Sequence, residues 1–474
     1  MAIITRPTES AGARHAPATA GPPPRRLRLW NVAAVGAIWL TSLAVVAIWV
    51  RGGGAQSMLS GPAPALIGAG RATGLVAANL LLYQVLLMAR VPLFENGFGR
   101  DGITRAHRVV GFWSFWLMLG HIVLIVAGYA LQAGIEPLRQ AWEFVWTYPG
   151  MLPAAVGTAL ILAVVVTSTR RRRRRTRYES WHLLHLYAYL GVGLAVPHML
   201  LTGGDFLASP LATAYWWGLW VTAAGCVVVF RIARPLLRSR RHRLRVGSVE
   251  PDGSRAVTVT MSGRHLDRLH ARSGQFFVWR FVDGAGWAAG HPLSLSAAPT
   301  RRSLTVTARV VGDGTARIAS LRRGTPVLVE GPYGVLTGEQ RTGRTLLLIG
   351  AGAGVAPLVA LAESETYPSG GAVLITRDHA EKEAIRAQRI RELSRMRGLR
   401  HVRLDGARAR SGSTWMPAAY SAWAGPDLLR YACAEIAVAD VYVCGPPTWM
   451  AGVVTDLHRA GARRSSIHTE SFTS

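Results

Sequence analysis

Long apolar segments fill the first half of the chain. A helix needs about 20 apolar residues to cross the hydrocarbon core of a bilayer. Six segments reach that length or nearly so, and they lie at about 29–50, 64–89, 106–131, 149–169, 178–201 and 211–230. We therefore predict a bundle of six transmembrane helices within residues 29–235.

Short runs of alternating apolar and polar residues begin after residue 240. Runs such as 256–261, 275–281 and 303–311 alternate with a period of two, and Gly and Pro residues separate them. This pattern is typical of antiparallel strands that bury one face. Residues 240–338 are therefore predicted to form an antiparallel β-barrel.

Residues 339–474 follow a third pattern. Apolar strands are expected at 345–349, 372–376 and 441–443, and the first is followed by a glycine-rich turn and an apolar helix. Fully apolar strands that alternate with helices predict a parallel sheet in an α/β nucleotide-binding domain. The predicted fold is multi-domain: a six-helix transmembrane bundle, then an antiparallel β-barrel, then an α/β parallel-sheet domain.

Composition supports a membrane protein with soluble parts. The 474 residues include 16 Trp, and the mean hydropathy is +0.22. Residues 1–28 are rich in Pro, Ala, Gly and Arg, which predicts a disordered tail. This tail is long for the basic region of a cleavable signal, so we expect the first apolar segment to be retained as a helix.

The formal charge of +28 comes almost entirely from arginine, and Lys382 is the single lysine. Arginines gather in the N-terminal flank, in the second and fourth connections and after the sixth segment, with a dense run at 170–175. The first, third and fifth connections hold only Arg51 and Arg139. By the positive-inside rule, both termini are predicted to be cytoplasmic in a multi-pass protein of the plasma membrane. Because the main basic run lies between apolar segments, we expect no nucleic-acid partner.

Cysteine usage excludes two kinds of site. Cys226, Cys433 and Cys444 are the only cysteines, and no two of them form a CxxC pair. Three such residues do not make a disulfide framework, and they cannot hold an iron–sulfur cluster with four cysteine ligands.

Four histidines lie in two of the apolar segments. His107 and His121 are 14 residues apart, and His185 and His198 are 13 residues apart. At a rise of about 1.5 Å per residue, each helix separates its two imidazoles by roughly 20 Å. Both segments run in the same direction, so His107 matches His185 in depth and His121 matches His198. Polar side chains at matched depths within a membrane favour two stacked haems, each held by two histidines.

The helical phase differs between the two segments. Fourteen residues at about 100° each place His107 and His121 on one face, whereas thirteen residues leave His185 and His198 on different faces. Pro197 can kink the second helix and change this phase. His182, one turn before His185, is a rival ligand. The alternative is that all four are core histidines hydrogen-bonded between helices.

Arg71 lies inside the second apolar segment. A buried guanidinium needs an anion, and haem propionates would supply one. The alternative is that Arg71 extends along the helix toward the outer surface.

Several short motifs follow strands in the second half. They are His291-Pro292-Leu293-Ser294, Gly312-Asp313-Gly314-Thr315, Gly331-Pro332-Tyr333-Gly334, Gly350-Ala351-Gly352-Ala353-Gly354-Val355-Ala356-Pro357 and Cys444-Gly445-Pro446. With the four histidines, these motifs resemble the ferric reductase and NADPH oxidase superfamily. That family joins a six-helix haem domain to a ferredoxin-reductase-like FAD and NAD(P)H module.

The resemblance implies roles for particular residues. The metal ligands would be His107, His121, His185 and His198. His291, Pro292 and Ser294 match the HPxS motif, and Ser294 would bond near the reactive edge of the flavin. Other cofactor contacts are implied at Arg309, Gly314, Thr315, Gly352, Gly354, Pro357, Arg377, Cys444, Gly445, Pro446 and Phe472. Phe472 resembles the aromatic residue that covers the flavin, and Cys444 would lie beside the nicotinamide. Catalytic roles therefore fall to Ser294, Cys444 and Phe472.

The implied cofactors are FAD, two haems of the b type and NAD(P)H. NADPH is favoured over NADH because Arg377 can meet a 2'-phosphate, and Arg408 and Arg410 lie near it in sequence. Electrons would pass from cytoplasmic NAD(P)H to an acceptor on the outer face of the lipid bilayer, either oxygen, giving superoxide, or a ferric chelate. A protein partner cannot be predicted. The alternative function is a cytoplasmic flavin reductase whose helices form a non-redox membrane anchor or channel.

Overall fold

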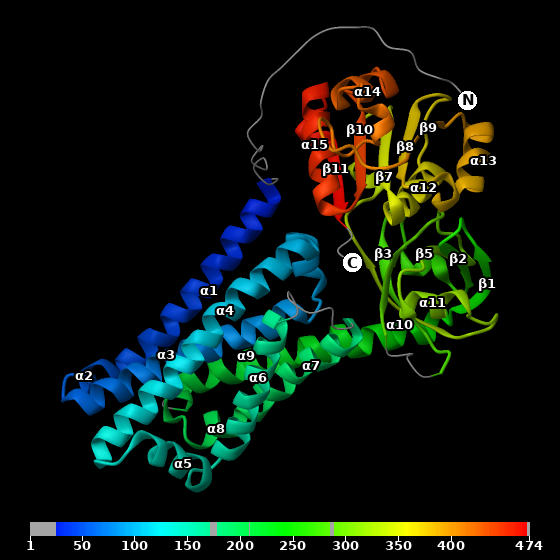
Figure 1. The fold of residues 1–474 in the computed structure, drawn as a ribbon. Helices are drawn as coiled ribbons and strands as arrows, with labels where there is room; N and C mark the ends of the chain where they lie inside the picture. The colour runs from blue at the N-terminus through cyan, green and yellow to red at the C-terminus, as the bar shows by residue number, and fades with distance from the viewer. Residues whose placement is uncertain (1–24, 171–177, 208, 285–288, 472–474) are drawn as a thin grey trace.

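The computed structural model describes residues 25–170, 178–207, 209–284 and 289–471. A bundle of long helices forms one half of the molecule, and two units built around β-sheets lie beyond one end of it (Figure 1). The two halves are joined by a continuous helical segment, Pro210–His242, which leads into the first strand.

The described part of the bundle contains five helices that are long and apolar enough to span a membrane. A shorter apolar stretch, His185–Leu201, belongs to the fifth predicted segment. The total of six spans stays a prediction. The bundle elements are α1 (Arg25–Arg51), α2 (Gly54–Met58), α3 (Pro62–Met88), α4 (Pro92–Ala133), α5 (Pro137–Thr147), α6 (Met151–Arg170), α7 (Tyr178–Leu194), α8 (Val196–Leu201), η1 (Gly204–Phe206), α9 (Pro210–Cys226), η2 (Val227–Ala233) and α10 (Arg234–His242).

Small residues bring α3 and α4 close together. A Cβ atom added to Gly70 would lie 2.8 Å from the side chain of Ile125, and one added to Gly128 would lie 2.7 Å from that of Ile67. Glycines at such positions let two membrane helices approach until their backbones are nearly in contact.

The observed helices differ from the prediction in three places. α4 begins at Pro92 rather than near residue 106, and α1 begins at Arg25, within the range predicted to be disordered. Residues 1–24 lie outside the described chain. The third connection contains an additional helix, α5, which buries Phe144 and Gln140 and exposes Trp142. This helix was missed because it is too short to have the length of a membrane span.

The fifth predicted segment is broken. α7 ends at Leu194 and α8 begins at Val196, so Ala195 stands between them. Pro197 occupies the first turn of α8, where its missing N–H leaves no helical bond unmade. The distortion predicted at Pro197 is therefore observed, and it divides His185 from His198.

The first sheet unit consists of two antiparallel three-stranded sheets. Their orders are β1-β2-β5 and β4-β3-β6, and isolated bridges join Arg245 to Pro326 and Leu295 to Val306. Antiparallel pairing is confirmed, whereas closure into a barrel stays a prediction. The strands are β1 (Arg245–Pro251), β2 (Ala256–Ser262), β3 (Phe276–Phe281), β4 (His291–Ser294), β5 (Ser303–Arg309) and β6 (Val327–Tyr333), with helix α11 (Asp313–Ala319) between the last two.

The second sheet unit contains one five-stranded parallel sheet in the order β11-β10-β7-β8-β9. The predicted α/β domain with a parallel sheet is therefore confirmed. Its strands are β7 (Leu346–Ala351), β8 (Ala372–Asp378), β9 (Arg400–Asp405), β10 (Asp440–Gly445) and β11 (Ile467–Ser471), and its helices are α12 (Val355–Ser364), α13 (Ala387–Arg397), α14 (Gly425–Ala432) and α15 (Pro447–Ala460).

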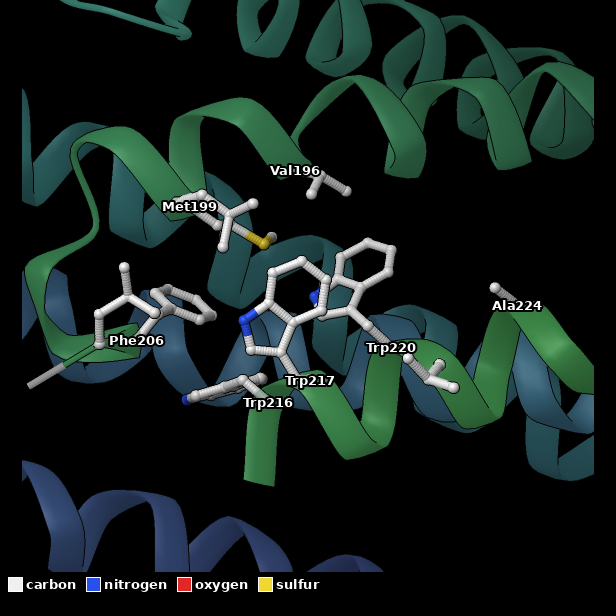
Figure 2. A pocket seen from close by; sticks show the side chains of 10 residues that line it. Val196, Met199, Phe206, Trp216, Trp217, Trp220 and Ala224 are labelled. Atoms are coloured by element: carbon white, nitrogen blue, oxygen red, sulfur yellow. The ribbon is translucent and has the colours of Figure 1, made fainter. Parts of the chain in front are cut away.

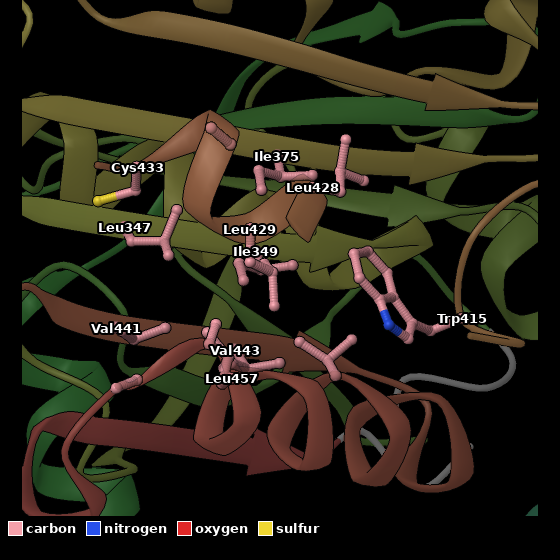
Figure 3. Packing of buried hydrophobic residues seen from close by; sticks show 14 of the residues in the cluster. Leu347, Ile349, Ile375, Trp415, Leu428, Leu429, Cys433, Val441, Val443 and Leu457 are labelled. Carbon is pink, nitrogen blue, oxygen red and sulfur yellow. The ribbon is translucent and has the colours of Figure 1, made fainter. Parts of the chain in front are cut away.

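Both faces of this sheet are buried. Leu347 and Ile349 of β7 face the cluster that contains Leu457 of α15 and Leu429 of α14 (Figure 3). The alternate residues of β7 belong to a second cluster, formed with α12 and α13. Burial on two faces explains why these strands are continuous apolar runs in the sequence.

Candidate functional site

The four histidines form two facing pairs inside the helix bundle. The ring centroids of His107 and His185 lie 6.0 Å apart, and those of His121 and His198 lie 6.3 Å apart. Two imidazoles that bind one metal ion from opposite sides, each with a metal–nitrogen distance of about 2.0 Å, have centroids about 6 Å apart. The separation of each pair therefore fits two imidazoles that would hold one metal ion between them.

The two pairs lie at different distances from the sheet units. α4 carries both His107 and His121, and Arg90, two residues before α4, contacts Glu330 of β6. His107 is the nearer of the two to the start of α4. We call His107 and His185 the inner pair, and His121 and His198 the outer pair.

Both imidazoles of the outer pair are held through Nδ1. Nδ1 of His121 lies 2.8 Å from the carbonyl oxygen of Gly70 in α3. Nδ1 of His198 lies 2.6 Å from Oγ1 of Thr202, whose hydroxyl also donates to the carbonyl of His198. The Gly70 carbonyl can only accept, so it requires a proton on Nδ1 of His121, and Nε2 of His121 keeps its lone pair. With its own proton on the His198 carbonyl, the Thr202 hydroxyl favours the same tautomer of His198. This is the tautomer of a metal-bound histidine with a second hydrogen bond behind it.

A glycine makes room for the His121 ring. A Cβ atom added to Gly74 would lie 2.5 Å from Nδ1 of His121. Gly74 and Gly70 therefore form one surface of α3, which accommodates the ring and accepts a hydrogen bond from its Nδ1.

The inner pair lacks this support at one of its members. Nδ1 of His107 is buried and has no hydrogen-bond partner among the described residues. Its partner His185 lies on α7, the helix that ends directly before the break at Ala195. The side chain of His182 lies outside the described part, so its competition with His185 stays untested.

Arg71 does not have the predicted burial. It follows Gly70 and so lies near the depth of His121, but its side chain is exposed on α3. The expected buried guanidinium is therefore wrong, and its exposure agrees with the alternative. The residue faces away from the helix neighbours because Gly70 and Gly74 take the positions that face α4. A propionate contact of Arg71 stays a prediction.

The HPxS motif forms strand β4. His291 pairs with Trp279 and Pro292 pairs with Val278 of β3. Ser294 is buried, and its Oγ has no hydrogen-bond partner among the described residues. A buried hydroxyl without a partner suits a site where a polar ligand atom supplies the bond. In the predicted pyrophosphate loop, Thr315 Oγ1 accepts from the backbone N–H of Val311 at 2.9 Å, and Gly314 lies beside it in α11.

The glycine-rich turn lies at the end of β7. Gly352 has a φ of 56°, which favours glycine, and Pro357 lies in the first turn of α12. A Cβ atom on Gly354 would lie 2.2 Å from the carbonyl oxygen of Cys444. The turn therefore packs against the end of β10, where Gly445 and Pro446 follow Cys444. Such close packing of glycine at a strand-to-helix turn is what a dinucleotide site requires.

Cys444 and Glu470 lie together at the carboxyl ends of β10 and β11. They pair in register, and Sγ of Cys444 donates to the carbonyl oxygen of Glu470 at 3.3 Å. Burial, followed by the charge of Glu470, raises the pKa of the Cys444 thiol well above its usual range. The thiol therefore stays protonated and does not act as a nucleophile. Phe472 lies outside the described residues.

Arg309 connects the two sheet units. Its guanidinium donates to Oδ1 of Asp378 at 2.5 Å and to the carbonyl oxygen of Glu383 at 3.1 Å. Burial raises the pKa of Asp378 to about 6, although the charge of Arg309 opposes this effect. The residue predicted to contact the flavin pyrophosphate is thus also an ion-pair partner of the nucleotide unit.

Arg377 is engaged by the backbone. Its guanidinium donates to the carbonyl oxygens of Gly406 and Asp378, and its side chain is buried. Arg408 is exposed and uses Nε to donate to Thr414 at 2.8 Å. A 2'-phosphate contact through Arg377 stays a prediction, and Arg408 is the more accessible cation at this strand end.

The described helices also line an apolar cavity of about 220 Å³. Its wall comes from α8, η1 and α9, and Trp216, Trp217 and Trp220 point into it (Figure 2). None of the predicted site residues lines this cavity, although Met199 follows His198 on α8.

Comparison with known proteins covers both halves of the chain. Residues 73–196 match the family model described as "Ferric reductase like transmembrane component". A superoxide-generating NADPH oxidase heavy chain of Dictyostelium discoideum is 23% identical over 321 residues, which cover 60% of this chain and 59% of that protein. The ferredoxin reductase component of 3-ketosteroid-9-alpha-monooxygenase from Rhodococcus rhodochrous is 26% identical over 230 residues, or 48% of this chain and 62% of the relative.

The chain is thus similar to proteins of the ferric reductase and NADPH oxidase superfamily in both halves. It carries a ferric-reductase-like transmembrane domain and a ferredoxin-reductase-type module. A ferredoxin NADP+ reductase from Neisseria gonorrhoeae with bound FAD and NADP is similar in structure over 48% of this chain and 97% of that one, with 20% identity and a TM-score of 0.39. The chain spans between 35% and 62% of the length of the first three curated relatives that it matches.

Three groups near the candidate sites of this ferric-reductase-like protein were not predicted from the sequence. The carbonyl of Gly70 gives no signal in a sequence, because every residue has one. Thr202 could have been found as a hydroxyl one turn after His198, since residues four apart are neighbours on a helix. Glu470 could have been found as the acidic residue beside Phe472 at the predicted flavin site.

Proposed function

We propose that this protein is a transmembrane oxidoreductase that takes electrons from NAD(P)H at its ferredoxin-reductase-type module and delivers them to an acceptor on the opposite face of the membrane. The observation that carries the proposal is the set of two facing histidine pairs on α4, α7 and α8, with ring centroids 6.0 and 6.3 Å apart. An oxidoreductase that only reduced soluble acceptors would need neither pair.

Two haems of the b type would occupy these pairs, one between His107 and His185 and the other between His121 and His198. When bound, FAD would supply the splitting of a hydride into single electrons, and haem would supply one-electron transfer. The residues of this chain would position the ligands: α4 holds one imidazole of each pair, and the Gly70 carbonyl and Thr202 hydroxyl favour the tautomers that leave the outer Nε2 atoms free to bind a metal.

Residues of the two sheet units would bind and orient FAD and NAD(P)H. Ser294 offers a buried hydroxyl to the flavin, and Gly352, Gly354 and Pro357 shape the turn for the dinucleotide. Cys444, whose thiol donates to the Glu470 carbonyl, would lie beside the nicotinamide. His291, Pro292, Arg309, Gly314 and Thr315 would bind FAD, and Gly445, Pro446 and Arg377 would bind the nucleotide. Phe472 would cover the flavin.

The direction of transfer follows from charge and from the position of the module. Arginines gather in the connections on the side of the inner pair, and Arg90 on that side contacts the module. The positive-inside rule makes this side cytoplasmic, together with both termini. The outer pair then faces the other side of the plasma membrane, and oxygen or a ferric chelate would be reduced there.

One experiment tests the proposal. The purified protein should give a reduced-minus-oxidised spectrum of low-spin b-type haem, with two haems per chain, and NAD(P)H should reduce that haem. Oxygen and ferric-chelate reduction, each measured with and without superoxide dismutase, identifies the acceptor. Absence of haem would contradict the proposal and leave a flavin reductase with a membrane anchor.

A further inference from the structure

Strand β6 of the flavin module is attached to the bundle through α10. The backbone N–H of Val329 donates to Oγ of Ser239 at 3.0 Å, and the guanidinium of Arg238 donates to the carbonyl oxygen of Gly331. Because α10 continues directly into β1, these contacts lie where the chain enters the module.

A second attachment comes from a distant part of the chain. Nη1 of Arg90, in the short connection between α3 and α4, lies 2.6 Å from Oε1 of Glu330. The same nitrogen donates to the hydroxyl of Tyr333 at 3.2 Å, and the guanidinium carbon lies 5.3 Å from the centroid of the Tyr333 ring. Arg90 has a φ of 62°, a conformation that non-glycine residues adopt rarely. The connection therefore turns in an uncommon way at the residue that reaches the module.

The carboxylate at this contact is buried, and its charge is paired. Only 6% of the Glu330 side chain and 18% of the Arg90 side chain are exposed. The Tyr333 hydroxyl donates to Oε1 of Glu330 at 3.0 Å, and Arg280 of β3 lies 3.3 Å from Oε2. Burial raises the pKa of Tyr333 to about 12 against the opposing charge of Arg90, so its hydroxyl remains a donor. Removing one member of such a buried network leaves its partners unpaired.

We propose that Arg90, Glu330 and Tyr333 form an interdomain clamp that fixes the flavin module against the inner-pair end of the bundle. Arg90 is a positioning residue: it touches no cofactor-binding residue named above, but it sets where β6 sits relative to α4. The clamp rests on the proposed function only for its kinetic effect, because electron transfer between the two halves would depend on this contact.

The variant Arg90→Ala tests the clamp in the full-length protein. Flavin reduction by NAD(P)H should stay within about twofold of the wild type, because that site lies within the module. Haem reduction, followed in the same stopped-flow experiment, should slow by about tenfold or more, since a misplacement of about 1 Å can cost about 100-fold in rate. Equal haem-reduction rates in the variant and the wild type would overturn the proposal.

Two further variants distinguish a specific effect of the Arg90–Glu330 contact from a general effect of removing a charge. Arg280→Ala removes the other arginine of Glu330 but leaves the contact between Arg90 and β6 in place, so its haem reduction should slow less than that of Arg90→Ala. The double variant Arg90→Glu with Glu330→Arg restores opposite charges across the contact and should recover part of the rate. An equal loss in Arg280→Ala, or no recovery in the double variant, would contradict an interdomain role.

Hydrogen exchange keeps the clamp testable without haem. Arg90→Ala should raise the exchange rate of the β6 amides, residues 327–333, whereas those of β8 should stay unchanged. If wild-type haem were never reduced by NAD(P)H while β6 responded in this way, the proposed function would fail and the clamp would stand. Unchanged exchange in β6 would reject the clamp itself.

Discussion

The inner and outer pairs each consist of two histidines, but they differ in the hydrogen-bond partners of their Nδ1 atoms. His121 and His198 each place Nδ1 within hydrogen-bond distance of an oxygen, the Gly70 carbonyl and the Thr202 hydroxyl. Nδ1 of His107 has no such partner among the described residues. A hydrogen bond behind a metal-bound imidazole fixes the ring and raises its basicity. Two sites with equal ligands are therefore expected to differ in redox potential.

The helices that carry the two pairs differ as well. His107 and His121 share one unbroken helix, α4, whereas Ala195 separates the helix of His185 from that of His198. Bringing His198 opposite His121 required a change of helical phase. The outer site thus depends on a helix break, two hydrogen bonds and a glycine surface. Single substitutions can therefore change it more selectively than the inner site.

Replacement of an outer ligand should have the largest effect. In His121→Leu, one axial ligand is lost, so we expect loss of the outer haem, about half of the total haem, and loss of acceptor reduction. Flavin reduction by NAD(P)H should survive. Haem content by the pyridine haemochrome method and superoxide yield measure the outcome, and His198→Leu is the matched variant. An unchanged superoxide yield in both variants would reject the outer route.

The pairing of the histidines was predictable because helix geometry is regular. A fixed rise per residue placed His107 with His185 and His121 with His198, and the mismatched 13-residue phase pointed to Pro197. Strand periodicity likewise predicted antiparallel pairing before residue 338 and a parallel sheet after it. These features depend on local spacing, which a single sequence contains.

The groups around the ligands were not predictable in the same way. Arg71 was expected to be buried, but the face of α3 that packs on α4 is set by Gly70 and Gly74, whose importance appears only when both helices are present. The Gly70 carbonyl and the ion pair of Arg90 with Glu330 join residues far apart in the chain. Such contacts are determined by packing between elements rather than by patterns along one of them.

Crowding of the outer site should have an intermediate effect. In Gly74→Ala, the new Cβ would lie 2.5 Å from Nδ1 of His121, a ring that the Gly70 carbonyl also restrains. Overpacking of this kind costs about 1–3 kcal/mol, so we expect reduced occupancy of the outer haem with the inner haem retained. Haem content and the low-temperature spectrum of the two haems provide the measurement.

Gly120→Ala is the control for this crowding. Gly120 directly precedes His121, but a Cβ atom there would meet nothing within 4 Å among the described residues. Its haem content should therefore equal that of the wild type. If both alanine variants lost haem equally, the effect would come from the helix and not from contact with the His121 ring.

Removal of one hydrogen bond should have the smallest effect and separates the two sites most finely. Thr202→Val keeps the shape of the side chain but leaves Nδ1–H of His198 without its acceptor. A less basic imidazole stabilises ferric iron less, so the midpoint potential of the outer haem should rise, by roughly 60 mV for each tenfold change in relative affinity for the two oxidation states. Redox titration of both haems measures this shift, and the inner potential should not move.

Thr222→Val is the matched control, because the Thr222 hydroxyl bonds to the carbonyl of Gly218 on its own helix. Equal shifts in the two variants, or a shift of the inner haem alone, would show that the hydrogen bonds behind the histidines do not distinguish the pairs.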